Sequence, residues 1–346
     1  MNKIKALLIT ALLAVTATAA NAKDNVLYFY NWSEYMPEEL LQEFEQETGI
    51  KVIYTTYDSN EMMFAKVDQL KGKGYDIVVP STYYVKKMAD AGLLQAVDKT
   101  KLSNFKHLDT AMLDKEYDPN NTYSIPYIWG STGIGIYTDE IDPTTITSWK
   151  DLWDPKWEGQ LMLMNDPREV FHMALRILGY STNSQDPAQI KEAYELLRKL
   201  MPNALTFNSD NPGAPYVAGD VSLGMIWNGS TYEAQKEDPA ISMIYPTEGA
   251  VFWMDNMSIP VGAENVEAAH KMINFLLRPE IAARVSEEIG YPTANKSAKA
   301  LMDPDFAGNP LVFPSAEVIE AGEFQSDVGD AVQLYSDYWD KLRAGM

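Results

Sequence analysis

The sequence contains no cysteine and only three histidines. The lack of cysteine excludes disulfide bonds, thiolate metal sites, cysteine nucleophiles and a lipid-modified cysteine. His107, His172 and His270 lie far apart, and no two of them have the spacing of metal ligands. We therefore expect no metal and no cofactor, and we assign these histidines to the surface or the core.

The short motifs of common enzyme classes are also missing. No P-loop, no GxGxxG, no HExxH and no GxSxG is present. A Ser-His-Asp arrangement assembled only in space would leave no such local signal. We predict a protein that is not an enzyme, and the alternative is a secreted carbohydrate hydrolase with Asp166 or Asp255 as acid and base.

Basic residues are scarce relative to acidic ones. The chain has 28 Lys and Arg against 49 Asp and Glu, a formal net charge of −21. Such a surface disfavours nucleic acid and anionic membranes and attracts cations. Acidity also serves solubility alone, so the positions of the carboxylates must decide what kind of ligand is bound.

An apolar run of the length of a membrane span is absent, even at the N-terminus. Lys3 and Lys5 precede an apolar stretch from Ala6 to about Ala17, and Ala20-Asn21-Ala22 fits a signal-peptidase site. This pattern predicts a cleaved signal peptide over residues 1–22, too short to span a bilayer. We expect a mature protein from Lys23, secreted into a periplasm, with no stable membrane insertion.

The remaining chain alternates strand and helix periodicity. Its length suits two domains. In the first part, the order β-α-β-α-β-α predicts a parallel sheet with right-handed crossovers. Predicted strands there are Val26–Tyr30, Lys51–Tyr57 and Asp76–Val79, and predicted helices are Pro37–Glu47, Glu61–Lys71 and Tyr83–Ala91.

A second α/β unit follows a glycine-rich stretch at residues 130–135. The chain leaves the first unit near Gly133 and returns near Ser258, which predicts a hinge of two segments. We predict a two-lobed fold, each lobe a mostly parallel sheet flanked by helices. The predicted lobes are 23–133 with 258–300, and 134–257 with 301–346; strands are predicted at Gly133–Tyr137, Gln160–Met164, Ser222–Trp227, Ile241–Tyr245 and Phe252–Ile259, and helices at Pro167–Leu178, Pro187–Leu200, Pro212–Gly219, Thr231–Lys236, Glu267–Leu277, Pro279–Ile289 and Asp327–Leu342.

Carboxylates stand beside aromatic residues where predicted strands end. Trp253 and Asp255 share one strand face, since side chains alternate along a strand. A cleft between two lobes, at the carboxyl ends of strands, is a natural ligand site. The segments are Trp32-Ser33-Glu34-Tyr35, Ser81-Thr82-Tyr83-Tyr84, Asp166-Pro167-Arg168-Glu169, Trp227-Asn228 and Trp253-Met254-Asp255.

A linear polyamine fits this mixture of residues. Its ammonium groups require carboxylate partners, because an unpaired buried cation is unfavourable. Aromatic faces pack against methylene groups and attract the cation by about 0.5–2 kcal/mol per contact. Each segment also has a structural interpretation: Asp166–Glu169 is a capping box with proline in the first turn, and Trp32, Tyr83 and Trp227 could serve packing.

At these residues the sequence closely resembles the spermidine/putrescine-binding proteins of bacterial polyamine ABC importers. The resemblance covers the whole mature chain and implies a type II periplasmic binding fold that closes on its ligand. It is carried by residues 30–35, 79–85, 165–169, 225–229 and 252–256, with Gly290-Tyr291-Pro292-Thr293 as a further match.

The resemblance also implies a role for each site residue. Asp166 and Glu169 would hold one terminal ammonium, Asp255 the inner amine, and Glu34, with Ser33 and Gln325 nearby, the other end. Ser81 and Ser209 would add hydrogen bonds. The methylene chain would lie between Trp32, Tyr35, Tyr83, Trp227, Trp253 and Tyr291.

Glu34 resembles the spermidine-preferring branch, so we expect spermidine over putrescine, with norspermidine open. The implied partner is an inner-membrane ABC permease, and we expect a monomer that binds no nucleic acid. Two alternatives keep the binding class: a partner of a membrane polyamine sensor, and a ferric-ion-binding protein that uses Tyr83 and Tyr84.

Overall fold

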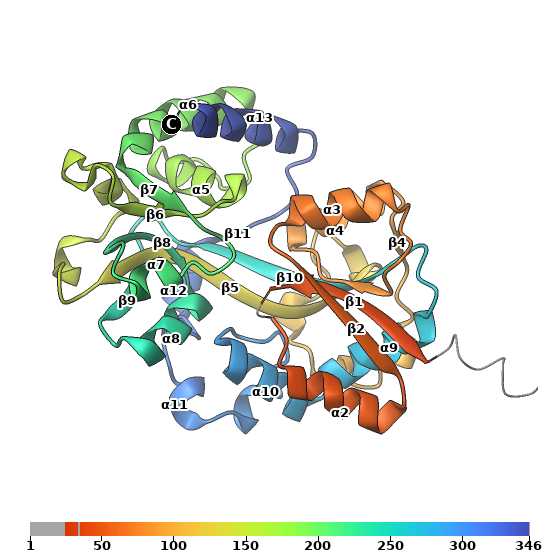
Figure 1. The fold of residues 1–346 in the computed structure, drawn as a ribbon. Helices are drawn as coiled ribbons and strands as arrows, with labels where there is room; N and C mark the ends of the chain where they lie inside the picture. Colours follow the sequence, from red (N-terminus) through yellow and green to blue (C-terminus); the bar gives the residue numbers. More distant parts are fainter. Residues whose placement is uncertain (1–24, 34, 346) are drawn as a thin grey trace, which may run out of the picture.

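The computed structural model describes residues 25–33 and 35–345. The predicted signal peptide and Glu34 lie outside the described residues. Two α/β lobes stand side by side and share one continuous sheet (Figure 1). Within the described part of the chain, no helix combines the length and the apolar character that a membrane crossing requires.

The first lobe contains the strand–helix alternation that the periodicity predicts. Strand β1 pairs in parallel with β2 on one side and β3 on the other. Its elements are β1 (Val26–Trp32), β2 (Lys51–Tyr57), β3 (Ile77–Val78), α2 (Glu38–Thr48), α3 (Asn60–Gln69), α4 (Thr82–Asp90), α9 (Val266–Leu276) and α10 (Pro279–Ile289).

Helix α2 shows how the sequence determines an element of this lobe. Leu40 and Phe44, four residues apart, are fully buried. Gly49 adopts a left-handed conformation (φ 70°), and its N–H donates to the carbonyl of Glu45 at 2.8 Å. The predicted start at Pro37 is one residue early, because Pro37 has an extended ψ of 129° and precedes the helix.

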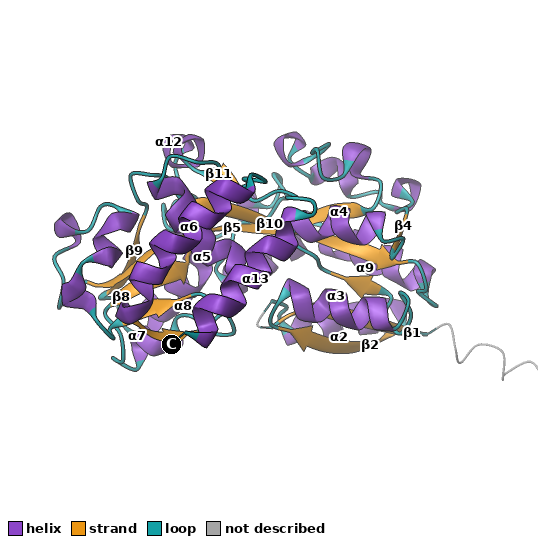
Figure 2. Cartoon of the chain, turned by 90° about the horizontal axis from the view of Figure 1, so that it is seen from above, coloured by secondary structure: helices purple, strands orange, loops and turns teal. Residues whose placement is uncertain are grey.

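The second lobe is built around parallel strands covered by helices. Strand β6 lies between β7 and β8 and is parallel to both. Helix α13 packs against α5 and α6 (Figure 2). The elements are β6 (Leu161–Leu163), β7 (Ala204–Phe207), β8 (Leu223–Trp227), β9 (Ile241–Ile244), α5 (Pro167–Ile177), α6 (Pro187–Leu200), α7 (Ala214–Val217), α8 (Asn228–Glu237) and α13 (Ala331–Ala344).

Two long antiparallel strands, β5 (Ser124–Tyr137) and β10 (Val251–Pro260), run through both lobes (Figure 1). Ile125 and Ile128 of β5 belong to the core of the first lobe, whereas Ile134 and Ile136 belong to that of the second. The sheet order is β2-β1-β3-β10-β5-β8-β6-β7, with β9 beside β5, and β4 (Leu94–Gln95) and β11 (Glu323–Phe324) beside β10.

The prediction that a strand begins at Gly133 is wrong, because β5 begins at Ser124. The glycine-rich stretch at residues 130–135 suggested the start of a new strand, but a single strand runs through it. Gly130 is required for packing rather than for a turn: a Cβ atom there would lie 2.5 Å from the Trp253 ring. Close approach of the indole therefore explains a glycine that the sequence alone presents as a loop signal.

The predicted lobe boundaries at residues 133 and 258 both fall inside the crossing strands. Beyond residue 300, the chain contacts both lobes. Met302, Phe306 and Val312 form a small core with Ala282 and Ala283 of α10, before the chain reaches α13 through α11 (Pro304–Ala307) and α12 (Ala316–Ala321). The assignment of residues 301–346 to the second lobe stays a prediction.

Candidate ligand-binding site

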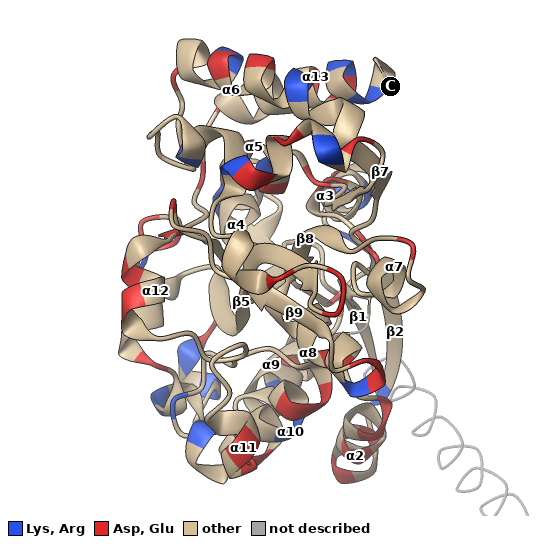
Figure 3. Ribbon diagram, turned by 90° about the vertical axis from the view of Figure 1, so that its left-hand side faces the viewer, with Lys and Arg blue, Asp and Glu red and all other residues tan. Residues whose placement is uncertain are grey.

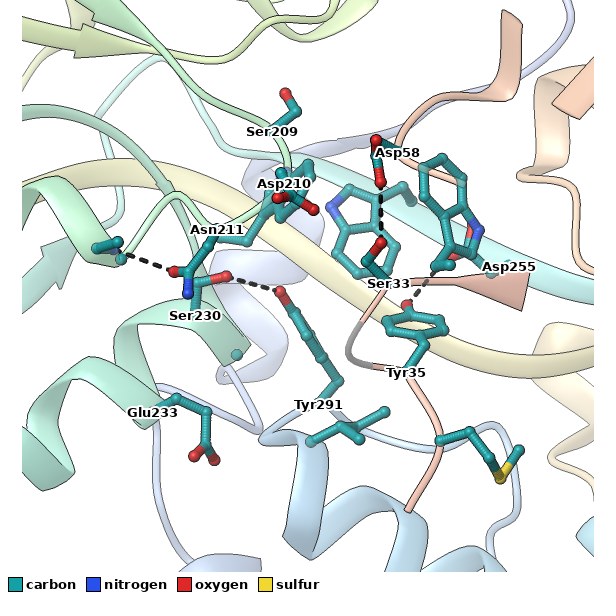
Figure 4. Close-up of a pocket in the computed structure, with 18 of the residues that line it drawn as sticks. Ser33, Tyr35, Asp58, Ser209, Asp210, Asn211, Ser230, Glu233, Asp255 and Tyr291 are labelled. Carbon is teal, nitrogen blue, oxygen red and sulfur yellow. Dashed lines mark hydrogen bonds between the residues drawn. The ribbon is translucent and has the colours of Figure 1, made fainter. Parts of the chain in front are cut away.

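A cavity of about 850 Å³ lies between the lobes and receives side chains from both (Figure 4). From the first lobe, β1, β2 and the residues that follow β1, β2 and β3 contribute to the lining. From the second lobe, the start of α5, the end of β8 and the loop before α7 contribute. Of the site residues predicted from the sequence, those that line the cavity are Trp32, Ser33, Tyr35, Ser81, Tyr83, Asp166, Glu169, Ser209, Trp227, Trp253, Asp255, Tyr291 and Gln325.

Asp255 of the crossing strand β10 lies on the cavity wall and is only 3% exposed. Its carboxylate accepts hydrogen bonds from the Tyr35 hydroxyl at 2.8 Å and from the Ser81 hydroxyl at 2.5 Å. Burial raises the pKa of Asp255 to about 7, although both hydrogen bonds favour the ionised form. The side chain is therefore held in place, and no basic side chain of the described residues is among the groups that shift its pKa.

The segment that starts α5 both caps the helix and lines the cavity. Asp166 Oδ1 accepts the backbone N–H groups of Arg168 at 2.7 Å and Glu169 at 3.1 Å, as an N-cap does. Its Oδ2 faces the Tyr83 hydroxyl at 3.4 Å across the cleft. The cap and the site are thus the same structure, and burial raises the pKa of Asp166.

Glu169, one turn along, points to the same wall of the cavity. Its Oε1 accepts a hydrogen bond from the Gln325 side-chain amide at 3.2 Å. Burial and the neighbouring Asp166 raise its pKa to about 8, although Thr132 and Gln325 favour the charged form. Arg168 donates to Asn183 and lies against the Tyr83 and Tyr335 rings. Its charge lowers the pKa of Asp166 and of Glu169, but burial raises both pKa values by more.

The placement of Gln325 differs from the expectation that grouped it with Glu34 and Ser33. Its backbone N–H donates to the Phe252 carbonyl at 2.7 Å, beside the short strand β11, and its side chain reaches Glu169. Ser33 instead donates to Asp58 at 2.8 Å. Gln325 therefore belongs with the carboxylates of α5, because the pairing of β11 with β10 determines where the chain passes the cleft.

Aromatic rings form the other surface of the cavity. The Trp253 ring lies 6.2 Å from Trp227 and 5.3 Å from Tyr291, and Tyr291 lies 5.8 Å from Tyr35. The indole N–H groups of Trp227 and Trp253 are buried and have no hydrogen-bond partner, whereas that of Trp32 donates to the Val79 carbonyl at 2.9 Å. These rings present flat apolar faces next to buried carboxylates.

Acidic residues surround this site, and Figure 3 shows such positions on α2, α8 and α10. Among the described residues that line the cavity, none is Lys, Arg or His. A cavity with this lining favours a cation and repels anions. The lining carboxylates are Glu38, Glu39, Asp58, Asp166, Glu169, Asp210, Glu233, Glu237, Asp255 and Glu288.

Several lining residues were missed by sequence reasoning, among them Asn60, which is only 1% exposed. Asp58 and Asn60 follow strand β2, as Ser33 follows β1 and Ser81 follows β3. The rule that strand ends carry ligand residues was applied to β1 and β3 but not to β2. Applied to β2 as well, it would have indicated both residues.

The geometry of Tyr83 and Tyr84 does not favour iron ligation by the adjacent phenols. Tyr83 faces the cavity and Asp166, whereas the Tyr84 hydroxyl donates to Glu61 at 3.0 Å. Burial raises the pKa of both phenols, which opposes phenolate formation. Within residues 25–33 and 35–345, no group of three or more His, Asp and Glu side chains is arranged to hold a metal ion.

Two lobes joined by crossing strands, with a cleft lined from both sides, define the class of two-lobed solute-binding proteins. The model of the family described as "Bacterial extracellular solute-binding protein" matches residues 39–314. A solved ABC-transporter protein of Listeria monocytogenes has a TM-score of 0.89 and 34% identity, covering 93% of this chain and all of that one. The type II periplasmic binding fold expected from the sequence is confirmed.

Relatives of known name narrow the family further. The spermidine/putrescine-binding periplasmic proteins of Salmonella typhimurium and Escherichia coli are each 55% identical to this chain over 340 residues, which cover 98% of this chain and 98% of each relative. The chain therefore belongs to the bacterial extracellular solute-binding proteins, in the branch of the spermidine/putrescine-binding periplasmic proteins.

Proposed function

We propose that this protein captures a linear polyamine in the periplasm, in the cleft between its lobes, and delivers it to an inner-membrane ABC permease. The observation that carries the proposal is a set of three carboxylates, the buried Glu169 and Asp255 and the half-buried Asp166, which face an aromatic cavity with no basic residue in its described lining. The names of the 55% identical relatives point to the same ligand class.

Each buried group has a role that fits the chemistry of a triamine. Asp166 and Glu169, with Gln325 beside them, hold one terminal ammonium, and Asp255 holds the inner amine. Ser33 and Glu34 receive the other end, and the indole and phenol rings pack on the methylene groups. Carboxylates at fixed positions along the slot measure the distance between nitrogens, and we propose spermidine as the preferred ligand.

Ligand binding couples to closure of the lobes in this proposal. The carboxylates come from different parts of the chain. Asp166 caps α5 and Glu169 lies in the first turn of that helix, whereas Asp255 is on a crossing strand and its hydrogen-bond donors are in the first lobe. A polyamine that bridges them favours the closed arrangement because only there do all carboxylates reach it. A micromolar Kd corresponds to a binding free energy of about 8 kcal/mol, which a few charge-assisted contacts and the packing of aromatic rings on the ligand can supply.

Isothermal titration calorimetry of the purified protein with spermidine, putrescine and a neutral sugar tests this function. Heat of binding with the amines and none with the sugar is expected, with spermidine the tighter amine. Mass spectrometry of the released ligand should return spermidine unchanged, as expected of a binding protein without catalysis. Comparable binding of the sugar, or no binding of either amine, would refute the proposal.

A further inference from the structure

A buried asparagine at the base of the cleft has no place among the roles proposed above. Asn60 is the first residue of α3, and its side chain lies between two hydroxyl groups that face the cavity. Its Nδ2 donates to the Ser81 hydroxyl and to the Tyr83 hydroxyl, each at 3.0 Å. One amide therefore links the two hydroxyls that contact Asp255 and Asp166.

The orientation of this amide follows from the donors around it. The Ser81 backbone N–H can only donate, and it lies 3.1 Å from Asn60 Oδ1, so the oxygen must occupy that side. The NH₂ group then faces both hydroxyls, and it can only donate. The single hydrogen of each hydroxyl is left for another acceptor: Asp255 Oδ1 at 2.5 Å from Ser81, and Asp166 Oδ2 at 3.4 Å from Tyr83.

We propose that Asn60 is a positioning residue for ligand capture. By donating to both hydroxyls, it directs their hydrogens toward Asp255 and Asp166, and so holds both carboxylates ready to accept ammonium groups. The inference rests on the proposed function. It means that Asn60, which touches neither carboxylate, influences the hydrogen bonding of both.

The surroundings of the two carboxylates show why the orientation of the Ser81 and Tyr83 hydroxyl hydrogens matters. Among the described residues, the titratable side chains that interact with Asp255 are the phenols of Tyr35, Tyr57 and Tyr117, and none is basic. Donors to a carboxylate favour its charged form, and their loss favours the protonated acid. Without Asn60, the Ser81 hydroxyl can turn away and leave Tyr35 as the remaining side-chain donor to Asp255.

Asp166 has a different environment, which limits the effect there. Its titratable and charged neighbours among the described residues are Arg168, Glu169, Glu61, Tyr83 and Tyr84. Two backbone N–H groups still hold Oδ1 when the Tyr83 hydroxyl turns. Most of the effect of Asn60 should therefore pass through Ser81 and Asp255.

The substitution Asn60→Asp keeps the shape of the side chain and reverses its hydrogen-bonding polarity. A carboxylate at position 60 accepts from both hydroxyls and draws their hydrogens away from Asp255 and Asp166. Charge alone predicts tighter binding of a cation, whereas loss of the donors predicts weaker binding, by about tenfold at pH 7 in calorimetry with spermidine. Binding as tight as in the wild type, or tighter, overturns the inference.

A second variant, Asn60→Leu, removes the donors without adding charge. The Kd for spermidine is measured from pH 6 to pH 9, together with thermal unfolding of the ligand-free protein. We expect the loss to be largest near pH 6 to 7 and to shrink toward pH 9, where Asp255 ionises even without its donor. A merely structural defect lowers the affinity by the same factor at every pH, and that result contradicts the proposal.

A double-mutant cycle identifies the path of the effect. In a protein that already carries Ser81→Ala and Tyr83→Phe, the change Asn60→Leu should alter the Kd less than twofold, because no hydroxyl remains to be oriented. Full additivity means that Asn60 acts by another route. A wild-type protein that fails to bind spermidine refutes the proposed function itself, whereas variants that match a binding wild type refute only the role of Asn60.

Discussion

The inner wall and the rim of the cleft carry the same chemical group in two different environments. On the inner wall, Asp255 and Glu169 are 3% and 4% exposed, and hydrogen-bond donors hold them in place. On the rim, Glu38, Glu39 and Glu288 are exposed to solvent. The contrast indicates that burial, rather than the number of acids, determines where a cation is bound specifically.

The energetic reason lies in solvation. An exposed carboxylate keeps its water shell, so an ammonium beside it gains little, and salt screens the attraction. A buried carboxylate has already lost much of its hydration, so a cation bound beside it supplies the electrostatic stabilisation that water no longer provides. Inner carboxylates should therefore determine affinity and ligand choice, and rim carboxylates should influence mainly the rate of encounter.

The largest effect is expected when an inner carboxylate loses its charge. Asp255→Asn keeps the shape of the side chain but removes the proposed partner of the inner amine, and loss of one member of a buried charge pair costs about 2–5 kcal/mol. We expect the Kd for spermidine to rise at least about 30-fold in calorimetry. Unchanged unfolding of the ligand-free variant is the control, and wild-type affinity would show that the inner amine binds elsewhere.

A change of pH tests the inner wall without mutation. The raised pKa values of Asp255, about 7, and Glu169, about 8, mean that the empty site holds protons at neutral pH. Amines remain charged up to a pH of about 10, so binding must release these protons. The affinity should rise about tenfold or more from pH 6 to pH 8. Heats measured in phosphate and in Tris should differ by the buffer ionisation, and identical heats would contradict proton release.

Stability of the ligand-free protein should show the opposite trend. Unfolded carboxyls lose their protons near pH 4, while these two keep theirs until about pH 7 to 8 in the folded state. The unfolded state therefore binds fewer protons across this window, so their contribution to stability falls as pH rises. Thermal unfolding across this pH range, with and without spermidine, measures this effect. Bound spermidine should reduce the loss of stability with rising pH, and an equal loss in the presence of the ligand would contradict the prediction.

Much of the fold could be predicted from the sequence, because the spacing of apolar residues and the residues that start and end helices agree with the buried faces and the element ends of the structure. Helices Pro187–Leu200 and Pro279–Ile289 have the predicted ends, since proline marks their starts. The full length of β5 was missed, because the glycine-rich stretch that begins at Gly130 signals a break when the packing of Trp253 is unknown. Such a contact joins residues far apart in sequence, and local patterns cannot show it.

The residues of the candidate site likewise fall into those marked by a local sequence signal and those that only the folded structure brings together. Residues beside strand ends, such as Ser81 and Asp166, were found because a local signal marks them and a family resemblance supports it. The partnership of Asn60 with Ser81 and Tyr83, and that of Gln325 with Glu169, could not be found in this way. These contacts depend on how α3 and β11 are placed against the crossing strands, which is a property of the assembled fold.

The smallest effect is expected at the rim, where Glu288→Gln provides the matched comparison for Asp255→Asn. Both changes replace a carboxylate by its amide on the wall of the same cleft, but Glu288 is exposed. We expect a Kd for spermidine within about twofold of the wild type and a modestly slower association at low salt, because rim charges act on encounter. Stopped-flow tryptophan fluorescence at two ionic strengths measures both quantities. A loss comparable to that of Asp255→Asn would mean that the ligand extends to the rim, and the division between inner wall and rim would then be wrong.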